Sequence, residues 1–156
     1  MGVLRIESVD IAETCIAAKV RVADGVPLRT SAVEGLAEQA LQLLPGLARH
    51  RCNNDDGRRF VDELRNTEVP HLLEHLTIEL LALAGLPRSL PAQTTWDFAR
   101  DGRGVFHVRV ACDDGTTALR ALSEAGAVLD WLFGFDDEAP DVQAITDRLL
   151  KMRLRV

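Results

Sequence analysis

The chain has 156 residues, of which 47% are hydrophobic and 27% charged, and its formal net charge is −6. This mixture is typical of a globular protein with enough apolar surface to form a core, which excludes intrinsic disorder. The acidic balance and the lack of a long Lys/Arg run disfavour nucleic-acid binding. No stretch is long and apolar enough to cross a membrane or to act as a signal peptide, so we expect a cytoplasmic protein.

The first half of the chain predicts two strands followed by three helices. Both strands fall within the first 22 residues, where apolar and polar side chains alternate. Ser31 and Glu34 have the spacing of a capping box, so a helix is expected to begin at Ser31 and to end at Pro45-Gly46. A polar loop over residues 50–57 then precedes two further predicted helices, Arg58–Arg65 and Pro70–Ala84.

The second half predicts two more strands and two more helices. The strands are expected at Thr94–Ala99 and Gly104–Cys112, and Thr116 is the expected cap of a helix that runs to about Phe133. A last helix is predicted over Pro140–Met152. The whole pattern predicts an α+β fold over residues 1–156 as a single domain, with a small antiparallel sheet of about four strands packed with several helices.

One motif carries candidate chemistry, because His71-Leu72-Leu73-Glu74-His75 (HxxEH) lies on the best-predicted helix. Helical geometry places His71 and His75 about 40° and one turn apart, so both imidazoles can reach one point. Zinc is commonly held in this way, and Glu74 projects where it could deprotonate a metal-bound water, as in the inverzincin signature. The alternative interpretation is that His71 and Glu74 form a surface pair while His75 packs at the edge of the core.

Glu79 extends the motif to HxxEHxxxE, and two roles are open for it. It could be the third metal ligand, but an ideal helix carries it about 6 Å beyond His75. It could instead orient His75 from behind without touching the metal.

The segment His50-Arg51-Cys52 comes shortly before this helix. His50 offers a hydrogen-bond donor, Arg51 could bind a substrate carboxylate with two hydrogen bonds, and Cys52 is a soft metal ligand. A loop histidine beside a buried thiol is the more ordinary interpretation. The three cysteines contain no CxxC pair, so neither a disulfide framework nor a cysteine-type zinc site is predicted.

Residues 40–86 contain several separated blocks, namely Leu44-Pro45-Gly46-Leu47, His50-Arg51-Cys52, Leu64-Arg65 with Thr67, and the HxxEHxxxE segment. In the order and spacing of these blocks the chain resembles the N-terminal domain of cyanophycin synthetase. Cyanophycin is a poly-aspartate whose side-chain carboxylates carry arginine. The resemblance implies an α+β domain that binds this polymer and, in some members, a metal-dependent site that cuts it.

Residue by residue, the resemblance implies metal ligands at His71, His75 and Glu79, with Glu74 as the general base. It also implies that Arg51 and its neighbour His50 lie near the substrate. These residues include no ATP-grasp or Mur-ligase-like domain of a synthetase, so we do not expect ATP-driven amide synthesis from them.

The leading hypothesis is therefore a metallopeptidase-like hydrolase that uses Zn2+ or a similar divalent metal. Its substrate would be a cyanophycin-like or other peptide polymer, and the acidic balance of the chain suits an arginine-rich one. The second hypothesis is a non-catalytic polymer-binding or scaffold module that partners a separately encoded ATP-dependent amide ligase. A third is a domain whose histidines only pack. No nucleic acid or membrane is expected as a partner, and a homo-oligomer is compatible with the sequence.

Overall fold

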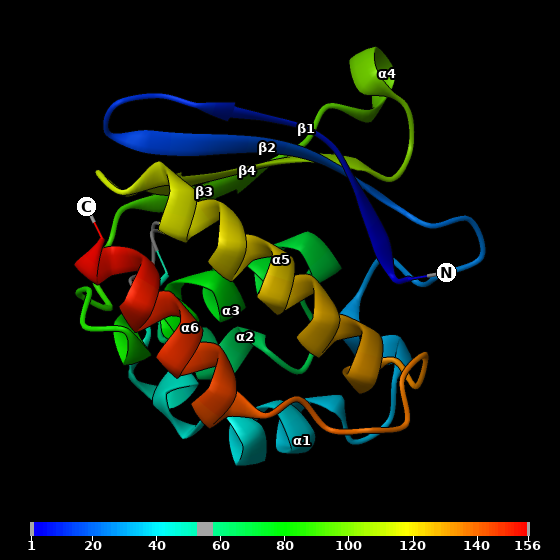
Figure 1. Cartoon of the computed structure of the whole chain (residues 1–156). Coiled ribbons are helices and arrows are strands. Elements are labelled where there is room, and N and C mark those ends of the chain that lie inside the picture. The colour runs from blue at the N-terminus through cyan, green and yellow to red at the C-terminus, as the bar shows by residue number, and fades with distance from the viewer. Residues whose placement is uncertain (1, 53–57, 156) are drawn as a thin grey trace.

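Four strands form one antiparallel sheet in the computed structural model, which describes residues 2–52 and 58–155 (Figure 1). The spatial order is β1-β2-β4-β3, and every neighbouring pair is antiparallel. Within the described residues, β3 is an edge strand that pairs with β4 alone. The bounds are β1 Leu4–Ile11, β2 Cys15–Val22, β3 Ala92–Thr95 and β4 Val105–Ala111.

All helices except the short one at Phe98–Asp101 lie on one face of this sheet, which confirms the predicted α+β class (Figure 1). Along β2, Ile16, Ala18 and Val20 are buried, whereas Lys19 and Arg21 on the other face are only partly covered. An antiparallel sheet with one wet face produces this alternation. The helices are α1 Leu36–Leu43, α2 Phe60–Glu63, α3 Val69–Leu83, α4 Phe98–Asp101, α5 Gly115–Leu132 and α6 Val142–Leu154, with 3-10 turns at Thr30–Ala32 and Pro45–Arg49.

Helix α3 positions the candidate site because neighbours surround it on every side. It packs on α5, on β3 and β4, and on the 3-10 turn Pro45–Arg49. Pro70 occupies its first turn, where the missing N–H costs nothing, and Gly85 follows its end with a φ of 96°. The surrounding elements bury polar side chains together with the apolar ones, including Glu74, His75 and Glu79. The prediction of this helix is confirmed to within one residue at each end.

Two predicted helix caps are wrong, those at Ser31 and Thr116. Helix α1 begins at Leu36, because Gly35 takes a left-handed conformation with a φ of 77° and Ser31 lies in the preceding 3-10 turn. Helix α5 is capped by the side chain of Asp114, which accepts a hydrogen bond from the Thr117 N–H, and not by Thr116.

The predicted strand Thr94–Ala99 is also only partly correct. Strand β3 ends at Thr95, because the side chain of Asp97 caps the N–H of Arg100 and begins helix α4. Of the polar loop predicted over residues 50–57, residues 53–57 lie outside the described part of the chain. None of the described helices is long and apolar enough to span a membrane.

Candidate metal site

Three possible metal ligands meet between α3 and the segment before it. The Sγ atom of Cys52 lies 3.8 Å from Nε2 of His71 and 3.7 Å from Nε2 of His75. A tetrahedral zinc with bonds of about 2.3 Å to sulfur and 2.0–2.1 Å to nitrogen separates such ligands by about 3.5 Å. Among the described residues, Cys52, His71 and His75 form such a group, with one possible ligand atom of each within 4.8 Å of the other two. Their spacing and chemistry therefore fit zinc.

The other nitrogen of each imidazole is hydrogen-bonded away from Cys52. Nδ1 of His71 lies 2.8 Å from Oγ1 of Thr67, and Nδ1 of His75 lies 3.0 Å from Nδ1 of His50. Since the Thr67 hydroxyl donates to Glu68, its oxygen is free to accept the His71 N–H. Outer hydrogen bonds of this kind fix the tautomer of a metal-binding histidine. Both Nε2 atoms are thus left with a lone pair directed at one point.

His50 connects His75 to a buried carboxylate. Nε2 of His50 lies 2.8 Å from Oε1 of Glu79, so the carboxylate accepts the His50 N–H and leaves Nδ1 of His50 as an acceptor for His75. Arg88 donates to the same carboxylate through Nε at 2.8 Å and Nη2 at 3.0 Å. This chain of hydrogen bonds, from Glu79 through His50 to His75, holds the second imidazole in the ligand tautomer.

The ring of Phe60 packs against both imidazoles. Its ring stacks on His75 with a centroid distance of 3.8 Å and an interplanar angle of 15°. It meets His71 edge-on at 5.4 Å and 88°. Phe60 begins the short helix α2, and its side chain is fully buried. Packing therefore restricts the rotation of the same two rings that the outer hydrogen bonds orient.

Glu74 stands beside this group with a single strong hydrogen bond. Oγ1 of Thr94 on β3 donates to Oε2 of Glu74 at 2.6 Å, and Oε1 of Glu74 lies 3.8 Å from Nε2 of His75. Burial raises the pKa of this carboxyl to about 7, even though the Thr94 hydrogen bond acts in the opposite direction. At neutral pH Glu74 can therefore both take up and release a proton.

Burial also sets the charge of the three possible ligands. It lowers the pKa of His71 and, more strongly, that of His75, which His71 and His50 lower further. Both imidazoles are therefore neutral, as metal binding requires. Burial and the hydrogen bond to Glu63 raise the pKa of the Cys52 thiol, whose Sγ lies 2.8 Å from Oε2 of Glu63. A bound zinc would have to displace that proton.

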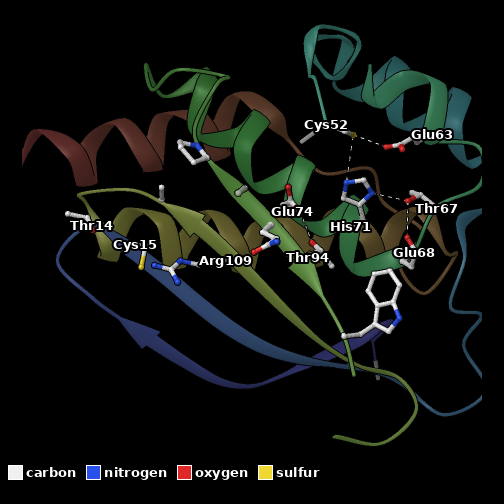
Figure 2. Close-up of a pocket in the computed structure, with 15 residues that line it drawn as sticks. Thr14, Cys15, Cys52, Glu63, Thr67, Glu68, His71, Glu74, Thr94 and Arg109 are labelled. Atoms are coloured by element: carbon white, nitrogen blue, oxygen red, sulfur yellow. Dashed lines mark hydrogen bonds between the residues drawn. The ribbon is translucent and has the colours of Figure 1, made fainter. Parts of the chain in front are cut away.

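A cavity of about 660 Å³ opens onto these groups (Figure 2). Cys52, His71 and Glu74 line it, and so does strand β3 from Ala92 to Thr94. Figure 2 shows Glu63, Thr67 and Glu68 clustered around His71, with Arg109 on the far side of β3. A second cavity of about 340 Å³ shares Glu74 and Ala92 with the first.

The structure brings some of the predicted site residues together and separates others. His71, His75 and Glu74 lie within reach of one point, as their helical spacing suggests. Glu79 is held by His50 and Arg88 and lies outside the group of three, so its geometry favours the orienting role over the ligand role. The structure does not support the predicted substrate contact of His50, because its side chain is buried and both ring nitrogens are occupied. Arg51 is exposed and lines the second cavity.

Sequence reasoning missed several residues that complete this arrangement. The sequence marks Cys52 only as a soft ligand in a loop, because no second cysteine stands near it. Thr67 precedes His71 by one helical turn, a spacing that could have suggested their hydrogen bond. Thr94 and Arg88 come from segments beyond the helix, and no local pattern marks them as partners of Glu74 and Glu79.

The fold and this cluster define the class as an α+β domain with a candidate zinc site on a buried helix. The chain belongs to the cyanophycin synthase-like N-terminal domain family, whose profile matches residues 18–133. A cyanophycin synthetase from Geminocystis herdmanii (strain PCC 6308) is 29% identical to it over 126 residues. That alignment covers 74% of this chain and 13% of the synthetase, so the chain spans a small part of its relative.

Proposed function

We propose that this domain is a zinc-dependent hydrolase, a peptidase or amidase that cuts a cyanophycin-like or other peptide polymer. The observation that carries the proposal is the position of Glu74. Its Oε1 atom lies 3.8 Å from Nε2 of His75, beside the three possible ligands, and it lines both cavities. A half-ionised carboxylate next to a three-ligand group is the arrangement expected of a metal-dependent hydrolase.

Cys52, His71 and His75 would hold the metal. Three protein ligands leave a fourth position open, which is the pattern of catalytic rather than structural zinc. When bound, zinc would polarise the amide carbonyl and acidify a water molecule. Thr67, His50 and Phe60 would keep the two imidazoles in place, and Glu79 would act on His75 only through His50.

Glu74 would move the proton. It takes a proton from the attacking water while the water oxygen bonds to the carbonyl carbon. It then gives that proton to the amide nitrogen as the C–N bond breaks, which yields a carboxylic acid and an amine. Thr94 holds Oε2 of Glu74 during both steps and leaves Oε1 on the side of the ligands. A pKa of about 7 suits both transfers.

The open edge of β3 offers a place for an extended peptide. The N–H of Ala111 donates to the carbonyl of Pro91, so Pro91 faces β4. In an antiparallel pair, alternate residues face the partner, so the backbone groups of Ala92 and Thr94 face the open edge. A peptide added along that edge would pass Glu74. Glu63, Glu68 and Glu74 line the same cavity, and they outnumber its arginine, Arg109, although Glu68 is already paired with Arg29. This acidic balance suits a cationic side chain such as arginine.

Metal content tests the site directly. Protein purified without chelator should contain about one zinc per chain, and the His71→Ala/His75→Ala double variant should contain none. Cys52→Ala should lose most of the zinc, whereas Glu79→Gln should keep it. The opposite result, with zinc kept in Cys52→Ala and lost in Glu79→Gln, would restore Glu79 as the third ligand. Absence of zinc from the wild type, even after zinc is added, would refute the metal site.

Hydrolysis tests the reaction. Zinc-loaded protein should cleave an aspartate polymer that bears arginine, or one of a panel of peptides, and Glu74→Gln should bind zinc without cleaving. Amine release measures both. Turnover by Glu74→Gln at the wild-type rate would exclude Glu74 as the base.

The comparison with a cyanophycin synthetase supports a second candidate, a module that binds the polymer beside an ATP-dependent amide ligase. If the domain is such a module, the wild type and Glu74→Gln should bind the arginine-bearing polymer equally well, and neither should cleave it.

A further inference from the structure

The second cavity differs in charge from the first. Its walls include three arginines, Arg49, Arg51 and Arg88, and Glu74 is its one carboxylate among the described lining residues. The larger cavity, by contrast, has Glu63, Glu68 and Glu74 in its walls against Arg109, and Glu68 is also paired with Arg29. Glu74 and Ala92 belong to both. The sign of the charge therefore changes across the carboxylate that would act as the base.

Two of these arginines flank a buried histidine. His50 follows the 3-10 turn Pro45–Arg49, and its side chain is buried in the core. Arg49 and Arg51, on either side of it in the sequence, are both exposed and line the cavity. Within residues 2–52 and 58–155, neither guanidinium has an ion pair or a side-chain hydrogen bond.

The third arginine is already fixed in position. Arg88 uses Nε and Nη2 to hold Glu79, which leaves its Nη1 group for another acceptor. The Glu79 carboxylate neutralises Arg88, so the net positive charge of the cavity comes from Arg49 and Arg51, and the Glu74 carboxylate in the same wall offsets part of it. This excess is small. It matches a singly charged anion better than a dianion such as phosphate.

We propose that the Arg49/Arg51/Arg88 cavity is a carboxylate subsite, which holds a carboxylate of the peptide on one side of the amide that is cut. The proposal rests on the hydrolase function proposed above for the neighbouring groups. Guanidinium groups bind carboxylates through paired, charge-assisted hydrogen bonds. The carboxylate is either the C-terminus of the peptide or the side chain of an acidic residue. The first source makes the enzyme a carboxypeptidase, and the second makes it cut internally beside an acidic residue.

Binding to chelator-treated protein tests this subsite without any turnover. An N-acetylated alanine peptide with a free C-terminus is compared with its C-terminal amide. A second pair, blocked at both ends, differs by one internal Asp or Asn. Affinity is measured by titration calorimetry. At least one acid should bind about tenfold more tightly than its neutral partner. The pair that shows this difference identifies the source of the carboxylate.

Variants assign the difference to this cavity. Arg51→Gln and Arg49→Gln should each remove most of the preference for the acid, whereas Arg109→Gln, on the wall of the larger cavity, should leave it unchanged. Equal binding of acids and neutral partners, or no binding of either, would overturn the subsite. So would inorganic phosphate displacing the peptide more strongly than acetate does. Because no metal is present, a retained acid preference in a protein without hydrolase activity would refute the hydrolase alone.

Discussion

Helix α3 buries two carboxylates, and their surroundings move their pKa values in opposite directions. Burial raises the pKa of Glu74 to about 7, because one hydroxyl, that of Thr94, is its main compensation. Burial acts on Glu79 in the same sense, but the hydrogen bonds of His50 and Arg88 outweigh it, and the pKa of Glu79 is lowered. The two residues are 5% and 1% exposed, so exposure does not explain the difference.

The comparison shows that partners, rather than depth, decide what a buried carboxylate can do. Glu79 has a complete set of donors and stays ionised, which makes it a fixed point for His50 and Arg88. Glu74 has an incomplete set and lies at the wall of two cavities, so its proton can be exchanged. Two carboxyl groups of one helix thereby acquire a structural and a chemical role.

Removing the better-partnered carboxylate should have the largest effect on stability. Glu79→Ala leaves the buried His50 without its acceptor and Arg88 without its counter-ion, which should lower the free energy of unfolding by about 3 kcal/mol. Glu79→Gln keeps one acceptor for His50 and should lose less. Urea unfolding measures both. Equal losses for Ala and Gln would show that an uncharged acceptor at this position contributes nothing, and wild-type stability in Glu79→Gln would show that the charge contributes nothing.

The pH dependence of stability should identify the other carboxylate. The pKa of Glu74 is about 7 in the folded chain against an ordinary 4.5, so the folded chain binds more protons than the unfolded one across that interval. Its contribution to stability is therefore present below pH 4.5 and is lost as the pH rises to about 7. The loss amounts to at most about 3 kcal/mol.

Glu74→Gln lacks this titration, so its stability relative to wild type should rise by that amount over the same interval. Chelator-treated proteins are compared by urea unfolding at a series of pH values. His71 and His75 are present in both proteins, so the part of their titration that does not depend on Glu74 cancels in the difference. A difference in unfolding free energy that stays constant with pH would mean that the pKa of Glu74 is not raised in the folded chain.

A methyl group placed against Glu79 should disturb its ion pair with Arg88 without removing either charge. A Cβ at Gly46 would lie 2.0 Å from Oε2 of Glu79 and 2.6 Å from its Cδ. Gly46→Ala should therefore displace the carboxylate and cost about 2 kcal/mol. Gly126→Ala is the matched control, because nothing lies within 4 Å of a Cβ there and the residue is helical. It should be neutral or slightly stabilising. Equal melting temperatures for the two variants would contradict the close packing at Gly46.

Local patterns in the sequence predict the elements whose neighbours along the chain define them. Helix α3 is an example, since Pro70 and Gly85 mark its ends. The start of α1 was misplaced because Gly35 turns the chain before the helix, and a capping-box pattern does not reveal that turn. Strand β3 is shorter than predicted because Asp97 bonds to a backbone N–H three residues on.

The candidate site divides in the same way. Helical spacing alone places His71, Glu74 and His75 together, because they share one helix. The contact of Cys52 with both histidines depends on how the preceding segment crosses α3. The pKa values of Glu74 and Glu79 differ because their hydrogen-bond partners differ. Two of these partners, Thr94 for Glu74 and Arg88 for Glu79, lie beyond the end of the helix. Tertiary packing brings them in, and no spacing in one sequence predicts it.

The smallest predicted effect concerns the imidazole that Glu79 does not reach. Thr67 holds Nδ1 of His71 and is buried, so Thr67→Val should weaken zinc binding about tenfold and lower stability by about 1 kcal/mol. Thr77→Val is the matched control, because the Thr77 hydroxyl is equally buried but donates to the Leu73 carbonyl within α3. It should cost similar stability and leave zinc binding unchanged. Competition with a chelator measures the affinity. If both variants bind zinc like wild type, the Thr67 hydrogen bond does not orient His71 as a ligand. Of the two outer hydrogen bonds, only that of His75 to His50 could then contribute to zinc binding.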